Sequence, residues 1–277
     1  MSRIIEIDNL SRSELDVYVR LTGAQLRSRL EPQRGIFIAE SPTVISVALE
    51  AGCTPISMLT DKRLLSGAIE ELAEKCADIP IYTAERDLLT EITGFELTRG
   101  ALAAMKRPPV RSAEDILASA KRVAVLEGIT DSTNIGAIFR SAAALGIDAI
   151  LLSPTACDPL SRRALRVSMG TALLIPFATL GDDPHTWQEQ GFSLLRRYGF
   201  KSCAMALRDD TVSLDDERLE REERLAIFLG TEGTGLTEKT VDACDFTVKI
   251  PMSRGVDSLN VAAAAAIAFW QLSKKKE

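Results

Sequence analysis

Two polar residues stand six positions apart at the start of a predicted helix, where they could bind a substrate. Asn134 and Arg140 belong to the segment 127–140, which follows an apolar run. Asparagine is a favoured N-cap residue, so Asn134 predicts the beginning of the helix. Arg140 falls on a helix face between two small residues, Gly136 and Ala144, where a ligand could approach the backbone. The alternative is an ordinary arginine on a solvated helix face.

A glycine-rich loop with an acidic residue at its centre follows a later apolar run. The segment 227–236 contains Gly230 and Glu232 but has neither a Lys-Ser/Thr pair nor the G-x-G-x-x-G spacing of phosphate-binding loops. The glutamate would also repel a phosphate. The loop therefore favours a neutral or cationic ligand that backbone groups recognise, with a plain glycine turn as the alternative.

A third polar segment precedes the last predicted helix. Ser258 is a good N-cap type for a helix that begins at Leu259. Asn260 lies one turn into this predicted helix, where it is a poor helix former with no evident packing role. We therefore treat Ser258 and Asn260 as candidate site residues.

The residue inventory excludes several classes of chemistry. The chain has one histidine, His185, in a turn-rich segment, and its five cysteines are spread singly. Histidine-dependent metal sites and serine or cysteine triads are therefore excluded, and we expect no metal. No export signal is evident, and the apolar stretch 259–270 is too short to span a bilayer, so we expect a cytoplasmic protein without a membrane partner.

The charge distribution bears on nucleic-acid binding. A net charge of −6 argues mildly against it, but binding depends on local patches. Basic residues cluster in three places: Arg20, Arg27, Arg29 and Arg34; Lys106, Arg107 and Arg111; and Arg162, Arg163 and Arg166. Each run taken alone is also typical of a solvated helix face.

Consecutive prolines predict a boundary between two domains. Pro108 and Pro109 indicate a linker over 108–115, with an N-terminal domain at 1–107 and a C-terminal domain at 116–277. In the first domain we predict strands at 35–39, 55–59 and 79–82 and helices at 42–51 and 67–76. In the second we predict strands at 122–126, 149–152, 173–177, 202–206, 225–229 and 246–250, and helices at 134–145, 160–167, 185–198 and 258–272. This alternation predicts an α/β fold with a mostly parallel sheet covered on both faces.

The three polar segments together resemble the signature motifs of the SpoU (TrmH-like) branch of the SPOUT methyltransferases. The resemblance runs from about Val123 to Leu272, and Ser168-Met169-Gly170 fits the family's intermediate segment. The N-terminal region resembles the family's smaller α/β RNA-binding domain, which is similar to ribosomal proteins that bind RNA kink-turns. Ala39-Glu40-Ser41 stands where relatives commonly have Val-Glu-Gly.

The resemblance implies a trefoil-knotted C-terminal domain, an obligate homodimer and S-adenosylmethionine as methyl donor. It implies transfer to a ribose 2′-hydroxyl in structured RNA, with ribosomal RNA first and tRNA second. The implied cofactor-binding residues are Leu207, Gly230, Ile250 and Leu259. The implied catalytic residues are Asn134, Arg140, Glu232, Ser258 and Asn260. Because a charged arginine offers no acceptor, we assign Arg140 to phosphate binding and stabilisation of the developing 2′-oxyanion.

Other functions fit parts of the same pattern. A non-catalytic RNA-binding relative of the same fold is the main alternative. A base N-methyltransferase of the wider superfamily and an antibiotic-resistance methyltransferase also stay open. A nucleotide-dependent enzyme would use the Gly230 loop, but the missing phosphate-binding residues argue against it.

Overall fold

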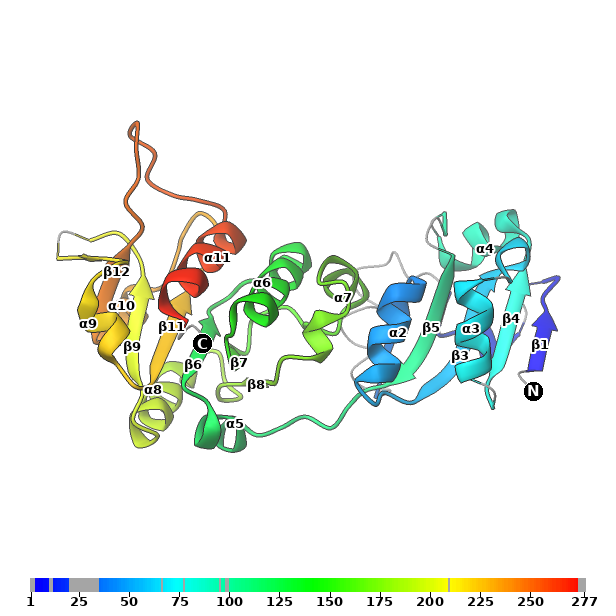
Figure 1. Cartoon of the computed structure of the whole chain (residues 1–277), viewed down its shortest axis with the longest axis horizontal. Coiled ribbons are helices and arrows are strands. Elements are labelled where there is room, and N and C mark those ends of the chain that lie inside the picture. Colours follow the sequence, from blue (N-terminus) through cyan, green and yellow to red (C-terminus); the bar gives the residue numbers. More distant parts are fainter. Residues whose placement is uncertain are drawn as a thin grey trace. The chain divides into compact units, whose positions relative to one another are not determined.

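The chain divides into two compact units (Figure 1). One unit comprises Met1–Pro109 and Leu160–Leu173, and the other comprises Val110–Pro159 and Leu174–Glu277. The computed structural model describes residues 3–9, 12–19, 35–65, 67–76, 78–94, 96–97, 100–208 and 210–273. The predicted arginine cluster of Arg20, Arg27, Arg29 and Arg34 lies outside the described residues.

The first unit is built on a mixed five-stranded sheet. In spatial order its strands are β1 (Arg3–Glu6), β4 (Pro80–Ala84), β3 (Pro55–Asp61), β5 (Ala101–Lys106) and β2 (Ile36–Glu40). The pairs β1–β4 and β4–β3 are parallel, whereas β5 runs antiparallel to both of its neighbours. Sequence reasoning missed β5, whose alanine-rich composition is more typical of helices.

Short helices complete the first unit. They are η1 (Ser13–Leu15), α2 (Pro42–Glu50), η2 (Lys62–Leu64), α3 (Ala68–Lys75), α4 (Arg86–Thr93), α7 (Arg162–Val167) and η3 (Thr171–Leu173). The segment that carries α7 and η3 lies between two strands of the other unit in sequence, but α7 packs against β2. Gly170 has φ +84° and lies so close to α2 that an added Cβ would be 3.0 Å from Val47.

Two arginines of α7 share one buried carboxylate. Glu40 is 3% exposed, and its Oε2 lies 2.9 Å from Nη1 of Arg162, which is 8% exposed. Its Oε1 lies 3.3 Å from Nη1 of Arg166. The solvated-face interpretation of this basic run is therefore wrong for Arg162, whose charge is balanced inside the unit.

The second unit contains a seven-stranded sheet in which every pair is parallel. In spatial order its strands are β10 (Val212–Ser213), β12 (Phe246–Lys249), β9 (Lys201–Met205), β11 (Leu225–Leu229), β6 (Arg122–Leu126), β7 (Ala149–Leu152) and β8 (Phe177–Thr179). The prediction of a strand over 173–177 was wrong, because Leu173 ends η3 and β8 begins at Phe177. The α/β class with a mostly parallel sheet is confirmed.

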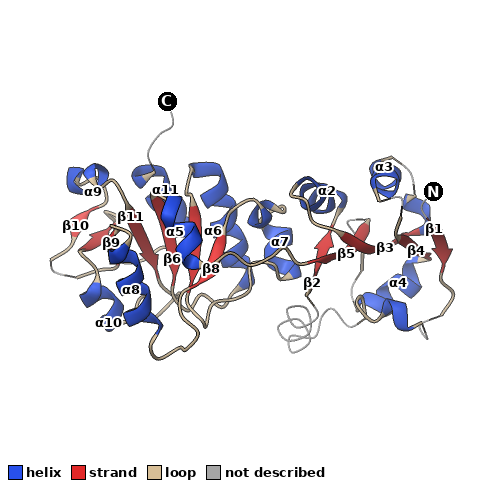
Figure 2. Cartoon of the chain, turned by 90° about the horizontal axis from the view of Figure 1, so that it is seen from below, coloured by secondary structure: helices blue, strands red, loops and turns tan. Residues whose placement is uncertain are grey.

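Helices lie on both sides of the strands of this sheet (Figure 2). They are α5 (Ala113–Ser119), α6 (Ser132–Leu145), α8 (Trp187–Arg197), α9 (Glu217–Arg221), α10 (Glu238–Ala243) and α11 (Val261–Leu272). Helices α5 and α8 share one core with β6 and β11, in which the rings of Phe192 and Phe228 stack at 4.9 Å. Helices α6 and α11 pack against each other. Helix α5 begins at Ala113, inside the stretch expected to be a linker.

No helix among the described residues combines the length and the apolar character that a membrane span requires.

Candidate functional site

The polar segments singled out in the sequence follow neighbouring strands of the parallel sheet. Ile250 follows β12, Leu207 lies two residues beyond β9, and Gly230 follows β11. Because these three strands are adjacent and parallel, the loops after them leave the same edge of the sheet. Ligands of open parallel sheets bind at this edge.

Three of the predicted catalytic side chains form one hydrogen-bonded cluster. Asn134 Nδ2 donates to Glu232 Oε1 at 3.1 Å, and Asn260 Nδ2 donates to Asn134 Oδ1, also at 3.1 Å. Asn260 Nδ2 also contacts Glu232 Oε1. We call Asn134, Glu232 and Asn260 the polar triad. It joins the start of α6, the loop after β11 and the start of α11.

The triad contains the cap of the last helix, and the sequence had placed that cap elsewhere. Helix α11 begins at Val261, and Asn260 Oδ1 accepts from the backbone N–H groups of Ala262 and Ala263 at 3.0 and 3.3 Å. The prediction that Ser258 caps this helix was therefore wrong. Asn260 is a poor residue for a helix interior but a good one for the N-cap that it occupies.

Asn134 is likewise not the cap of its helix. Helix α6 begins at Ser132, and the carboxylate of Asp131 accepts from the backbone N–H of Thr133 at 2.7 Å. Asn134 therefore lies inside the first turn, 7% exposed, with its side chain directed to Glu232 and Asn260. Because Asn134 does not cap the helix, its side-chain amide is available for the hydrogen bonds of the polar triad.

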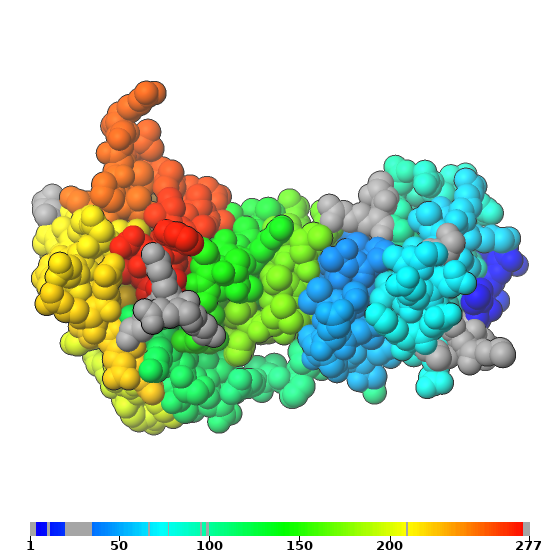
Figure 3. All heavy atoms as spheres, in the orientation of Figure 1, coloured from blue at the N-terminus to red at the C-terminus, as the bar shows by residue number. Residues whose placement is uncertain are grey.

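Two of the predicted catalytic residues lie outside the triad. Arg140 is exposed on α6, and the structure records no ion pair between it and Glu232 among the described residues. Ser258 is exposed and contacts the adjacent Asp257 at 3.4 Å. Residues 251–260 are almost all exposed and project from the unit, in orange in Figures 1 and 3.

The residues predicted to bind the cofactor differ in exposure. Leu207 is 54% and Leu259 40% exposed, whereas Ile250 is half-buried. At Gly230 the main chain turns back on itself, and a Cβ would lie 2.2 Å from the carbonyl carbon of Gly235. Only glycine fits there. The loop is closed by reciprocal backbone hydrogen bonds between Thr231 and Gly235, at 3.2 and 3.0 Å.

A buried acid that sequence reasoning missed lies beneath this loop. Glu127 follows β6 directly and is 6% exposed. Its Oε1 accepts from the backbone N–H of Thr237 at 3.4 Å, while its Oε2 is buried without a hydrogen-bond partner. An acidic residue directly after the apolar run 123–126 was the available signal in the sequence.

The described residues contain no group of three or more His, Cys, Asp or Glu side chains that could hold a metal ion. His185 lies in an exposed turn, where its backbone N–H donates to Asp183 Oδ1 at 3.0 Å. Burial raises the pKa of the Cys244 thiol to about 12, so this thiol is protonated at neutral pH.

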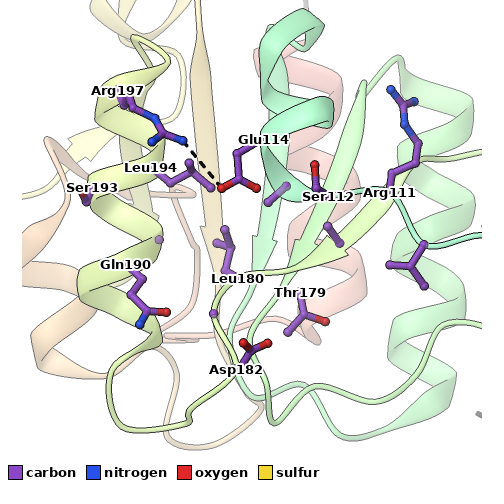
Figure 4. Close-up of a pocket in the computed structure, with 15 residues that line it drawn as sticks. Arg111, Ser112, Glu114, Thr179, Leu180, Asp182, Gln190, Ser193, Leu194 and Arg197 are labelled. Atoms are coloured by element: carbon purple, nitrogen blue, oxygen red, sulfur yellow. Dashed lines mark ion pairs between the residues drawn. The ribbon is translucent and has the colours of Figure 1, made fainter. Parts of the chain in front are cut away.

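A cavity of about 630 Å³ lies apart from the triad, between α5, α8 and the residues after β8 (Figure 4). Arg197 of α8 faces Glu114 of α5 across it, with Arg197 Nη2 3.7 Å from Glu114 Oε1. None of the predicted site residues lines this cavity.

Comparison with known proteins places these features in one family. The model of the SpoU rRNA Methylase family matches residues 121–270. A Mycobacterium bovis protein named as an uncharacterized tRNA/rRNA methyltransferase is 40% identical over 94% of this chain and 88% of its own length. The 23S rRNA (guanosine-2′-O-)-methyltransferase RlmB of Acinetobacter baylyi is 30% identical over 78% of this chain and 86% of its own. The crystal structure of the SpoU methyltransferase AviRb from Streptomyces viridochromogenes has a TM-score of 0.78 at 25% identity, and covers 94% of this chain and 96% of that one.

Proposed function

The chain belongs to the SpoU rRNA methylase family, and we propose that it transfers a methyl group from S-adenosylmethionine to a ribose 2′-hydroxyl in structured RNA. Ribosomal RNA is the first candidate substrate and tRNA the second. The observation that carries the proposal is the polar triad, which brings three separate sequence motifs together at the carboxyl edge of the parallel sheet. The similarity to RlmB supports the ribose as the position of transfer.

The residues around Gly230 fit a cationic nucleoside better than a phosphate. The loop 230–237 contains Glu232 and no lysine or arginine, and Glu127 lies buried beneath it with one oxygen unpartnered. Gly230 lets the main chain of the loop fold back against Gly235. We propose that Gly230, Ile250, Leu259 and Leu207 hold the cofactor mainly through backbone groups. When bound, S-adenosylmethionine would supply a sulfonium methyl group as the electrophile: the ribose 2′-oxygen would bond to the methyl carbon as the carbon–sulfur bond breaks and S-adenosylhomocysteine leaves.

The chain's own residues would align the acceptor ribose and stabilise its charge. Arg140 is exposed and carries no acceptor, so we assign it to binding the target phosphate and stabilising the developing 2′-oxyanion. The hydroxyl proton would then leave to water or to phosphate. Asn134, Glu232 and Asn260 fix the loops around the ribose, and Ser258 lies on the projecting segment that would contact substrate or a second subunit. Alignment supplies much of the rate in a two-substrate displacement.

We also propose that the protein is a homodimer. The outer face of α11 exposes apolar side chains, with Ile267 at 40% and Trp270 at 64%. The adjacent segment 251–260 projects into solvent with Leu259 on it. A second copy that covered this surface would complete the site around Ser258 and Leu259.

We further propose that the C-terminal segment is knotted. Helix α11 follows β12, which lies near one end of the sheet, but it packs against α6 and β11. The carbonyl of its last residue, Leu272, accepts a hydrogen bond from Arg122 Nε of β6 at 2.8 Å. The chain must therefore cross the ends of several strands after leaving β12. The domain at 1–107 is proposed as the RNA-binding domain, with the domain at 116–277 carrying catalysis.

The test is to place the methyl group. The purified protein is incubated with isotopically labelled S-adenosylmethionine and RNA from cells that lack the gene, and the RNA is digested to nucleosides for mass spectrometry. We expect a labelled 2′-O-methylnucleoside from ribosomal RNA. A label on a base would reject the proposed position. RNA binding without transfer would instead favour the non-catalytic relative.

A further inference from the structure

We propose that Glu127 is a charge-selective positioning residue of the methyl-donor site, which favours the cationic S-adenosylmethionine over the neutral S-adenosylhomocysteine. This inference rests on the proposed function. It concerns a residue outside the predicted catalytic and cofactor-binding sets, and it follows from three properties of Glu127: its position, its contacts and its unbalanced charge.

Glu127 holds the glycine-rich loop at both of its ends. Its backbone N–H donates to the carbonyl of Leu229 at 2.9 Å, directly before Gly230. Its side-chain Oε1 accepts from the backbone N–H of Thr237, the residue before α10, at 3.4 Å. Glu127 therefore fixes both the point where the loop leaves β11 and the point where it enters α10.

The carboxylate of Glu127 can accept more hydrogen bonds than it does in the structure. The residue is 6% exposed, and its Oε2 is buried without a hydrogen-bond partner. No ion pair of Glu127 is recorded in the described part of the chain. A structural need to hold Thr237 would be met by a neutral acceptor, such as the side-chain carbonyl of glutamine, at a lower desolvation cost.

The Cys244 thiol, one of the ionisable groups near Glu127, does not balance this charge. The Cys244 thiol lies within electrostatic range of Glu127 and is protonated at neutral pH, since burial raises its pKa to about 12. The loop above Glu127 contains no lysine or arginine and adds the acidic Glu232. The site therefore has an unbalanced negative potential beside Gly230, where a ligand with net positive charge is stabilised.

This potential distinguishes the methyl donor from the product. At neutral pH S-adenosylmethionine has a sulfonium, an ammonium and a carboxylate group, for a net charge of +1. Loss of the methyl group leaves S-adenosylhomocysteine with no net charge. A buried carboxylate near the site therefore favours binding of the donor and release of the spent product.

The experiment compares the affinities of both ligands for the full-length protein by isothermal titration calorimetry. In Glu127→Gln, which keeps an acceptor for Thr237 but removes the charge, we expect S-adenosylmethionine to bind about tenfold more weakly and S-adenosylhomocysteine to change by less than about twofold. The matched control is Glu238→Gln, which removes an equal charge from an exposed position on α10. This control should leave both affinities unchanged.

Two results would overturn the inference while leaving the proposed function intact. Equal weakening of both ligands would mean that Glu127 only shapes the loop, and unchanged affinities would mean that it does not act on the site. If Glu127→Gln does not fold, the wild-type protein is titrated with an analogue that has a protonated amine in place of the methylsulfonium group. This analogue should bind more tightly than S-adenosylhomocysteine, and equal affinity would reject charge selection. A wild-type protein that binds neither ligand would reject the proposed function as well.

Discussion

The side chain of Asn260 donates to Oδ1 of Asn134 at 3.1 Å and so ties the start of α11 to the first turn of α6. Its own Oδ1 accepts from two backbone N–H groups of α11. The same amide thus caps a helix and orients a candidate catalytic side chain. Stability and site geometry are therefore coupled at Asn260, and substitutions there should affect both.

Asn260→Ala should destabilise the second unit and disorganise the triad. Loss of the cap alone costs about 1–2 kcal/mol, because two N–H groups of α11 lose their acceptor. We expect a lower urea midpoint in circular dichroism together with loss of methyl transfer. Asn260→Asp keeps a capping oxygen, so its stability should be closer to wild type, but it places a second carboxylate beside Glu232 and should still impair transfer. Ser258→Ala is the control for stability, and an equal loss there would contradict the capping assignment.

Arg140→Ala should reduce methyl transfer without preventing cofactor binding. Arg140 is exposed and lies outside the triad, so its removal leaves the loops around Gly230 in place. We expect single-turnover rates to fall by about 100-fold or more, as for loss of one electrostatic contact to a developing oxyanion, with S-adenosylmethionine affinity within about twofold of wild type. Arg140→Lys, which keeps the charge but not the planar fork, should be intermediate. Near-normal turnover in the alanine variant would reject the assigned role.

The sequence predicted the strands of the second unit better than those of the first. Strands β6, β7 and β11 match the predicted ranges because, apart from Arg122 at the start of β6, they consist of apolar residues, as expected for strands buried on both faces. Strand β5 of the first unit was missed, since its alanines favour a helix unless close packing decides otherwise. Strand β8 was misplaced because η3 ends just before it and packs with α2 of the first unit, a long-range contact that periodicity does not reveal.

The site could be predicted only in part. The three polar segments that follow strands in the sequence identified Asn134, Glu232 and Asn260. The helix caps were assigned to the wrong residues, because several residues of cap-forming types stand close together. Asp131 and Asn134 are three residues apart, as are Ser258 and the first residue of α11, and local preference cannot choose between neighbours. Glu127 was missed because its place after an apolar run is only a weak signal. Its burial and its contact with the distant backbone N–H of Thr237 are not visible in the sequence.

Replacing Arg122 with methionine should strongly destabilise the second unit. The guanidinium of Arg122 is buried, which lowers its pKa, and it donates to the carbonyls of Leu272, Glu222 and Glu223 at 2.8–2.9 Å. Methionine fills similar space but leaves these acceptors without a donor, so we expect a loss of about 3 kcal/mol or more in free energy of unfolding, measured by urea denaturation. Lys121→Met is the control. Its exposed ion pair with Glu223 should contribute less than about 1 kcal/mol. Similar losses of unfolding free energy in the two variants would contradict the role of Arg122 in binding these three carbonyls.

Ser41→Gly should stabilise the first unit. Ser41 is the N-cap of α2 and has φ 92° and ψ 151°, a backbone conformation that is almost restricted to glycine and costs other residues about 1–3 kcal/mol. Its hydroxyl accepts from the backbone N–H of Val44 at a long 3.4 Å, so glycine loses a weak cap while it relieves the strain. We expect a net gain of about 1 kcal/mol in differential scanning calorimetry. Ser41→Ala removes the cap but keeps the strain and should lower stability. If alanine and glycine gave the same transition temperature, backbone strain at this position would not be the cause.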